Sequence, residues 1–181
     1  MEAKDEIDTH RMTARMLRQA ASLNRAAEIL YQVGNKPADK SHGDDFSAVF
    51  HGVPILRAQS AEIALKALWY IGRHREDGGP PRSHNLTKLH DVLPEKIQKL
   101  LVAAFPEISD PSSPHLPPVR QGLRAVLNEH EDALKQWRYT YEYDSLRFEN
   151  VFDEVLKTLM NTGWQLHTEW LNKLQAQGNP S

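Results

Sequence analysis

The sequence predicts an all-α protein, an antiparallel four-helix bundle with extra short helices. Apolar residues recur at steps of three and four along four long segments, as they do on the buried face of a helix. Loops rich in glycine, proline and aspartate separate these segments, and no segment shows the sustained period-two alternation of a strand. The chain has 181 residues, enough for one buried core, so we expect a single domain over residues 1–181 with its core at about 7–175.

The first long helix is expected from about Glu6 to Val33, because Gly34 and Asn35 supply its end. Its apolar face is predicted to consist of Met12, Met16, Ala20, Leu23, Ala27 and Leu30.

A turn through Phe46 and Phe50 precedes the second long helix, which is expected to end near His74. Proline fits the first turn of a helix but not its interior, so we expect a kink or a restart near Gly52 and Pro54. Polar side chains then fall at steps of three and four, at Gln59, Glu62, Lys66, Tyr70 and Arg73. The other faces are largely apolar, which predicts that neighbouring helices enclose most of this helix.

The remaining helices follow from caps and prolines. Asn85 or Ser83 caps a short helix that ends near Val92, and Pro94 opens another. Five prolines between residues 105 and 118 predict an irregular loop. The next helix is expected to bury Val119, Leu123, Val126, His130, Leu134 and Trp137, and the last helix, from Ser145, is expected to bury Phe148, Phe152, Val155, Leu159, Leu166 and Trp170.

Composition excludes several classes of protein. A mean hydropathy of -0.60 and the absence of a signal peptide or a long apolar run predict a cytoplasmic protein without membrane association. The chain has no cysteine, which excludes disulfides, thiolate metal sites and cysteine nucleophiles. Its nine histidines match no zinc-binding spacing and are interpreted as surface residues, so we expect no metal and no cofactor.

Two segments carry a resemblance to a known family. SAEIALKAL, followed by a loop and SHNLTKLHDVLP, resembles the core signature of HEPN domains, the higher eukaryote and prokaryote nucleotide-binding family. The later WRYTYEYD resembles the Arg-Tyr turn that precedes the final helix in that family. The resemblance implies an antiparallel four-helix bundle, a homodimer, and association with nucleotide, RNA or a partner nucleotidyltransferase, often in toxin-antitoxin or defence systems.

The same residues form a predicted polar cluster. Glu62 and Lys66 have the spacing of an ion pair along one helix, and His84 is placed to anchor the following loop through a hydrogen bond. Arg138 can cap helix carbonyls or bind a carboxylate such as Glu62 or Glu142. The cluster of Glu62, Lys66, His84, Arg138, Tyr139 and Glu142 is interpreted as either structural or ligand-binding.

Members of the family that cleave RNA resemble one another in an arginine followed, after four to six residues, by a histidine. Arg124 and His130 match this pattern and are the candidate catalytic pair: the imidazole could move a proton and the guanidinium could stabilise charge on phosphate. Ala125 stands where a polar residue is usual, and the two side chains are about 120° apart on a helix. Arg138, the other counterpart of the family arginine, has no histidine at the required distance.

Three hypotheses for the function therefore remain open. The leading one is an interaction module that binds nucleotide, RNA or a partner protein; the alternatives are a metal-independent endoribonuclease and a structural or scaffolding protein. A net charge of -2 requires that any binding of nucleic acid come from a local basic patch. Such a patch is predicted at Arg73, His74, Arg75, Arg82, His84, Lys88 and His90, interrupted by Glu76, Asp77 and Asp91.

Overall fold

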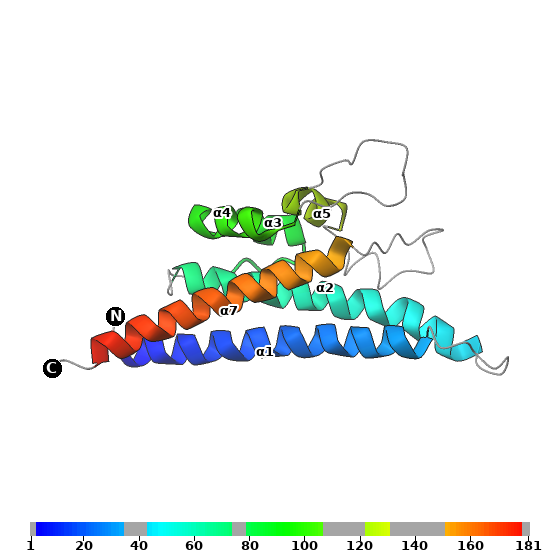
Figure 1. The fold of residues 1–181 in the computed structure, drawn as a ribbon, viewed down its shortest axis with the longest axis horizontal. Coiled ribbons are helices and arrows are strands. Elements are labelled where there is room, and N and C mark those ends of the chain that lie inside the picture. Colours follow the sequence, from blue (N-terminus) through cyan, green and yellow to red (C-terminus); the bar gives the residue numbers. More distant parts are fainter. Residues whose placement is uncertain (1–2, 35–42, 74–78, 107–121, 131–150, 179–181) are drawn as a thin grey trace.

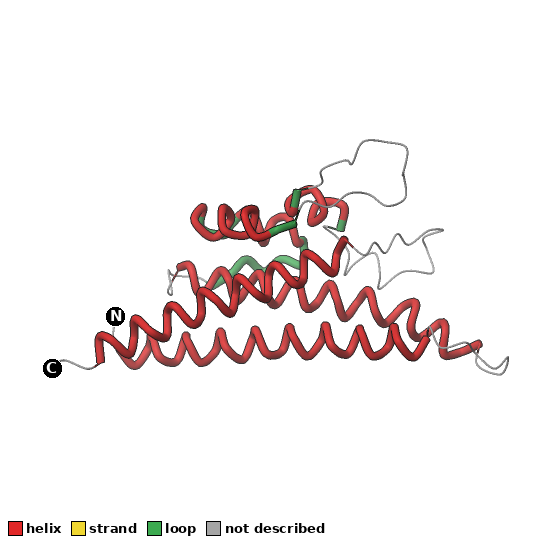
Figure 2. The backbone as a smooth tube through the Cα atoms, viewed as in Figure 1, coloured by secondary structure: helices red, strands yellow, loops and turns green. Residues whose placement is uncertain are grey.

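The computed structural model describes residues 3–34, 43–73, 79–106, 122–130 and 151–178, and these residues form helices and connecting loops without a strand. The helices are α1 (Ala3–Gly34), α2 (Gly43–Arg73), α3 (Leu86–Asp91), α4 (Glu95–Ala104), α5 (Leu123–Glu129) and α7 (Val151–Gly178). Figure 2 shows how little of this part of the chain is loop. The predicted all-α class is confirmed for the described residues.

The long helices α1, α2 and α7 lie side by side, and α1 is antiparallel to both of the others (Figure 1). The Ser60 hydroxyl of α2 donates a hydrogen bond of 2.8 Å to the Ala20 carbonyl oxygen of α1. The short helices α3, α4 and α5 lie together over α2 and α7, on the side away from α1. The long helix predicted over residues 119–137 is wrong in its described part, because α5 begins after Gly122 and ends at Glu129, where His130 leaves the helical conformation. The rest of that prediction lies outside the described residues.

Helix α2 continues through Pro54, so of the predicted kink or restart near Gly52 and Pro54 the restart is wrong. An interior proline removes one helix hydrogen bond and costs about 3 kcal/mol in an isolated helix. Here Val53 and Pro54 are both buried, and a side chain at Gly52 would lie 3.4 Å from Leu30 of α1. Packing along α1 therefore offsets the local cost of the proline.

The main core lies where α2 and α7 meet the three short helices. Its largest fully buried side chains include Leu65, Leu68, Leu86, Leu89, Leu101, Leu123, Leu127, Phe152, Leu156 and Leu159. The buried positions predicted for α7 are confirmed at Phe152, Val155, Leu159 and Trp170. Leu166 is only half-buried, and Phe148 lies outside the described residues. No helix within the described residues has the length and apolar character that crossing a membrane requires.

The apolar face of α1 differs from the prediction at two positions. Met12 is 36% exposed, whereas Leu17, which the prediction omitted, is fully buried. A side chain at Gly163 of α7 would lie 2.8 Å from Leu17 Cδ2, so Leu17 fills the space that this glycine leaves. The position of α7 therefore decides which residues of α1 are covered.

The interpretation of the histidines as surface residues is wrong for His10, His90 and His167, which are buried, whereas His130 is buried as predicted for its helix. His10 of α1 stacks on His167 of α7 with ring centroids 3.8 Å apart. Beside them the Trp170 indole donates a hydrogen bond of 3.0 Å to Glu6 Oε1. These contacts hold the start of α1 against the end of α7.

Because these histidines are buried and stacked, we predict that the free energy of unfolding falls in mild acid. Burial, together with the neighbouring His167 imidazole, lowers the pKa of His10 below 6.5. Between about pH 6.5 and this lowered pKa the folded protein then binds fewer protons than the unfolded chain, so the free energy of unfolding decreases as pH falls through this range. We expect a His10→Phe variant to lose part of this dependence, because phenylalanine keeps the stacked ring but cannot be protonated.

Melting temperatures measured from about pH 7.5 to about pH 5.5 check this prediction. One differentially bound proton changes the free energy of unfolding by at most about 1.4 kcal/mol per pH unit, which is about 3 to 6 °C for a chain of this size. An unchanged slope in His10→Phe would show that other groups cause the acid sensitivity.

Candidate functional site

The buried carboxylate of Glu62 on α2 brings together three members of the predicted polar cluster. Its Oε1 accepts a hydrogen bond of 2.6 Å from Lys66 Nζ, and its Oε2 lies 3.0 Å from His84 Nδ1. Glu62 is 8% exposed, whereas the His84 side chain is 78% exposed. The carboxylate thus ties the chain before α3 to the middle of α2 and leaves the imidazole facing solvent.

Hydrogen bonds hold the described residues that lead into α3. Asn85 caps α3, because its Oδ1 accepts a hydrogen bond of 2.8 Å from Lys88 N, and Ser83 Oγ accepts one of 3.1 Å from Asn85 N. Gly79 has a φ of 69° and lies against the Tyr70 hydroxyl; that conformation favours glycine. This backbone fixes the position of His84. Arg138, Tyr139 and Glu142, the other predicted members of the cluster, lie outside the described residues.

Arg124 and His130, the candidate catalytic pair, occupy different environments. The Arg124 side chain is 61% exposed, whereas His130 is 6% exposed. His130 follows α5, where its Nδ1 lies 2.9 Å from the Val126 carbonyl oxygen and its ring centroid lies 4.9 Å from that of Phe152. The imidazole thus belongs to the core and the guanidinium to the surface.

Asp91 at the end of α3 binds Arg124, and sequence reasoning missed this pair. The guanidinium donates two hydrogen bonds, from Nε to Oδ1 at 2.9 Å and from Nη2 to Oδ2 at 2.7 Å. These bonds hold the pKa of Asp91 at about 2 and raise that of Arg124. His90 Nδ1 lies 3.1 Å from the same Oδ1, while His90 Nε2 is buried without a hydrogen-bond partner among the described residues. The two partners are 33 positions apart, so no local spacing could have revealed them.

The described part of the predicted basic patch follows the same connection. Arg82, His84 and Lys88 are exposed. Arg73 is turned inwards instead, where it lies over the Trp69 ring at 5.8 Å and donates a hydrogen bond of 3.4 Å to the Val92 carbonyl oxygen. His74, Arg75, Glu76 and Asp77 lie outside the described residues. The exposed basic side chains of this patch therefore lie on residues 82–88, before α3 and in its first turn.

Within the described ranges, no three histidine or acidic side chains are grouped so that they could hold a metal ion. No family model, no curated protein and no solved structure matches this chain.

Proposed function

We propose that this chain is a HEPN-like interaction module that binds RNA through the α2–α3 connection without cleaving it. In this proposal the chain is a cytoplasmic homodimer that forms the antiparallel four-helix bundle implied by the resemblance. The resemblance of the two quoted segments to HEPN domains supports the bundle and the homodimer. The alternative hypotheses are that the ligand is a free nucleotide or a partner nucleotidyltransferase instead of RNA.

The charge of the α2–α3 connection is the observation that supports the proposed binding of RNA. Arg82, His84 and Lys88 are exposed on a backbone held by the Asn85 cap. Of the two acidic residues described in this region, Glu62 contacts Lys66 and His84, and Asp91 binds Arg124. Arg82 and Lys88 form no ion pair among the residues that the structure describes, and phosphate groups are attracted to exposed cations of this kind.

Binding of a labelled single-stranded RNA, followed by fluorescence anisotropy, tests the proposal. We expect the double variant Arg82→Gln, Lys88→Gln to bind about tenfold more weakly, as for two exposed contacts of about 0.7 kcal/mol each. Each lost phosphate contact should also reduce the slope of log affinity against log salt concentration by about 0.7, and both together by about 1.4.

A matched control removes the same charge elsewhere. Lys99 on α4 and Lys157 on α7 are exposed and lie outside the connection, so Lys99→Gln, Lys157→Gln should keep the wild-type salt slope. Equal weakening in both double variants would contradict the assignment to residues 82–88. Tight binding of a mononucleotide together with weak binding of RNA would indicate that the ligand is a free nucleotide.

The same RNA distinguishes binding from cleavage. Intact RNA after incubation with EDTA is the expected result. Cleavage that is lost in Arg124→Ala and His130→Ala variants that remain folded would instead support the metal-independent endoribonuclease. For the homodimer, light scattering should give twice the monomer mass of 20.7 kDa; a monomer at tens of micromolar would contradict it.

A further inference from the structure

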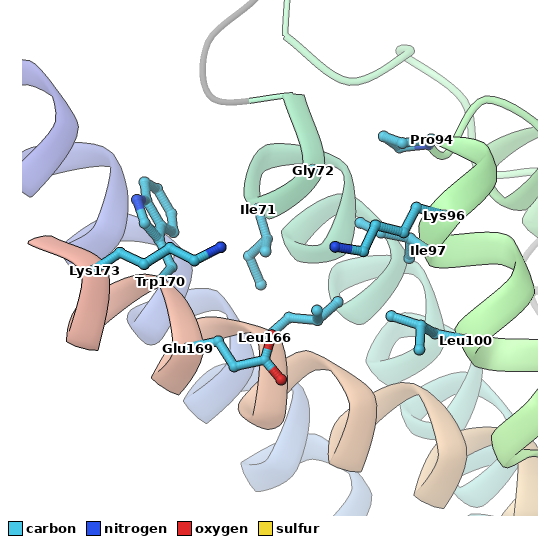
Figure 3. A pocket seen from close by; sticks show the side chains of 10 residues that line it. All are labelled: Ile71, Gly72, Pro94, Lys96, Ile97, Leu100, Leu166, Glu169, Trp170 and Lys173. Carbon is cyan, nitrogen blue, oxygen red and sulfur yellow. The ribbon is translucent and has the colours of Figure 1, made fainter.

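A small cavity lies between the end of α2, the start of α4 and the C-terminal part of α7 (Figure 3). Its volume is about 160 Å³. Its apolar lining consists of Ile71, Pro94, Ile97, Leu100, Leu166 and Trp170. An apolar cavity of about 150 Å³ is large enough to hold a benzene ring, so this one fits a single ring.

The walls of the cavity are held close together at Gly72. A side chain at this position would lie 2.6 Å from Ile97 Cδ1 and 2.7 Å from Pro94 Cγ. The backbone of α2 therefore meets the start of α4 directly, and this close approach forms one wall of the cavity. A preformed cavity reduces the ordering that binding a ligand requires.

Two lysines face each other across this apolar surface. The ammonium groups of Lys96 on α4 and Lys173 on α7 point toward one another from opposite sides, with Ile71 between them (Figure 3). Neither forms an ion pair among the residues that the structure describes. Like charges that converge without a counter-ion repel each other, and an anion placed between them would remove that repulsion.

One carboxylate also lines the cavity. Glu169 accepts a hydrogen bond of 3.1 Å from Gln165 and forms no described ion pair with either lysine. Two lysines and one glutamate leave a net charge of one positive unit, which fits a monoanion better than a dianionic phosphate monoester.

We propose that this cavity binds a small aromatic carboxylate, with its ring on the apolar lining and its carboxylate between Lys96 and Lys173. The volume selects the size of the ring, and the paired ammonium groups select the charge. The inference does not depend on RNA binding, because neither lysine belongs to the α2–α3 connection.

Titration of the full chain with benzoate, followed by calorimetry and by the NMR signals of Trp170, tests this proposal. We expect a Kd on the order of 1 mM, a typical affinity for a ligand of this size. Benzyl alcohol has the same ring without the charge and should bind about tenfold more weakly. The variants Lys96→Gln and Lys173→Gln should each weaken benzoate binding about threefold.

Two further variants distinguish binding of benzoate in this cavity from nonspecific attraction of anions to the protein surface. Glu169→Gln removes the opposing charge and should tighten benzoate binding about twofold to threefold. Lys99→Gln changes an exposed lysine of α4 that does not line the cavity and should leave the Kd unchanged. Equal affinity for benzyl alcohol, equal effects of Lys96→Gln and Lys99→Gln, or no saturable binding would overturn the proposal.

Discussion

Replacing Phe152 with alanine is expected to lower the free energy of unfolding by about 3 to 5 kcal/mol. Phe152 is fully buried at the start of α7, where its ring packs beside His130 after α5. Alanine would remove the ring and leave a cavity between α7 and the short helices, which the surrounding core can fill only in part. A chain of this size should then melt about 6 to 20 °C lower.

Urea unfolding followed by circular dichroism measures this effect, and two variants serve as controls. Phe152→Leu keeps most of the apolar volume and should cost less than about 1.5 kcal/mol. Val102→Ala changes a residue that is 61% exposed, so its effect should stay within about 0.5 kcal/mol. A loss below about 1 kcal/mol in Phe152→Ala would mean that this contact between α7 and α5 is not part of the stable core.

Removing Asp153 is expected to have the second largest effect, about 2 to 4 kcal/mol of destabilisation. Its Oδ1 lies 2.8 Å from Nη1 of Arg57, whose side chain is only 6% exposed. Asp153→Ala would remove the carboxylate that α7 places against this buried guanidinium of α2, and a buried charge that loses a nearby opposite charge is destabilised. The Asp153 side chain is 33% exposed, so water screens part of the loss.

A double-mutant cycle tests whether the cost comes from the charge left behind. Burial raises the pKa of Asp153, although Arg57 and Lys157 oppose this rise. Removal from water thus outweighs attraction at this carboxylate, and apolar replacement of both partners should be tolerated. We expect Arg57→Met, Asp153→Leu to be more stable than Asp153→Leu alone in urea unfolding. A double variant whose loss equals the sum of the losses in Arg57→Met and in Asp153→Leu would show that the two residues act independently.

Much of the fold can be predicted from local patterns. The apolar spacing in α7 predicted the buried positions Phe152, Val155, Leu159 and Trp170, because a helix that packs on one side needs apolar residues every three or four positions. The Asn85 cap was also predictable, since a side-chain oxygen at this position satisfies a backbone N–H of the first turn. Both features depend on residues only a few positions apart.

The candidate site was less predictable because its partners are distant in the sequence. Glu62 and Lys66 are four positions apart on one helix, and their pairing follows from helix geometry. Asp91 and Arg124 lie on different helices, α3 and α5, and no periodicity links them. The family-like spacing of Arg124 and His130 likewise did not reveal that one is exposed and the other buried.

The sequence by itself determined the all-α class, the positions of most described helices and many of the buried positions of α5 and α7. Only the tertiary structure decided that α2 passes through Pro54, that Leu17 rather than Met12 is buried, and that α4 approaches α2 closely at Gly72. The physical reason is the range of the interactions. Helix formation and capping depend on neighbours within one or two turns, whereas burial and close approach depend on which helix lies opposite.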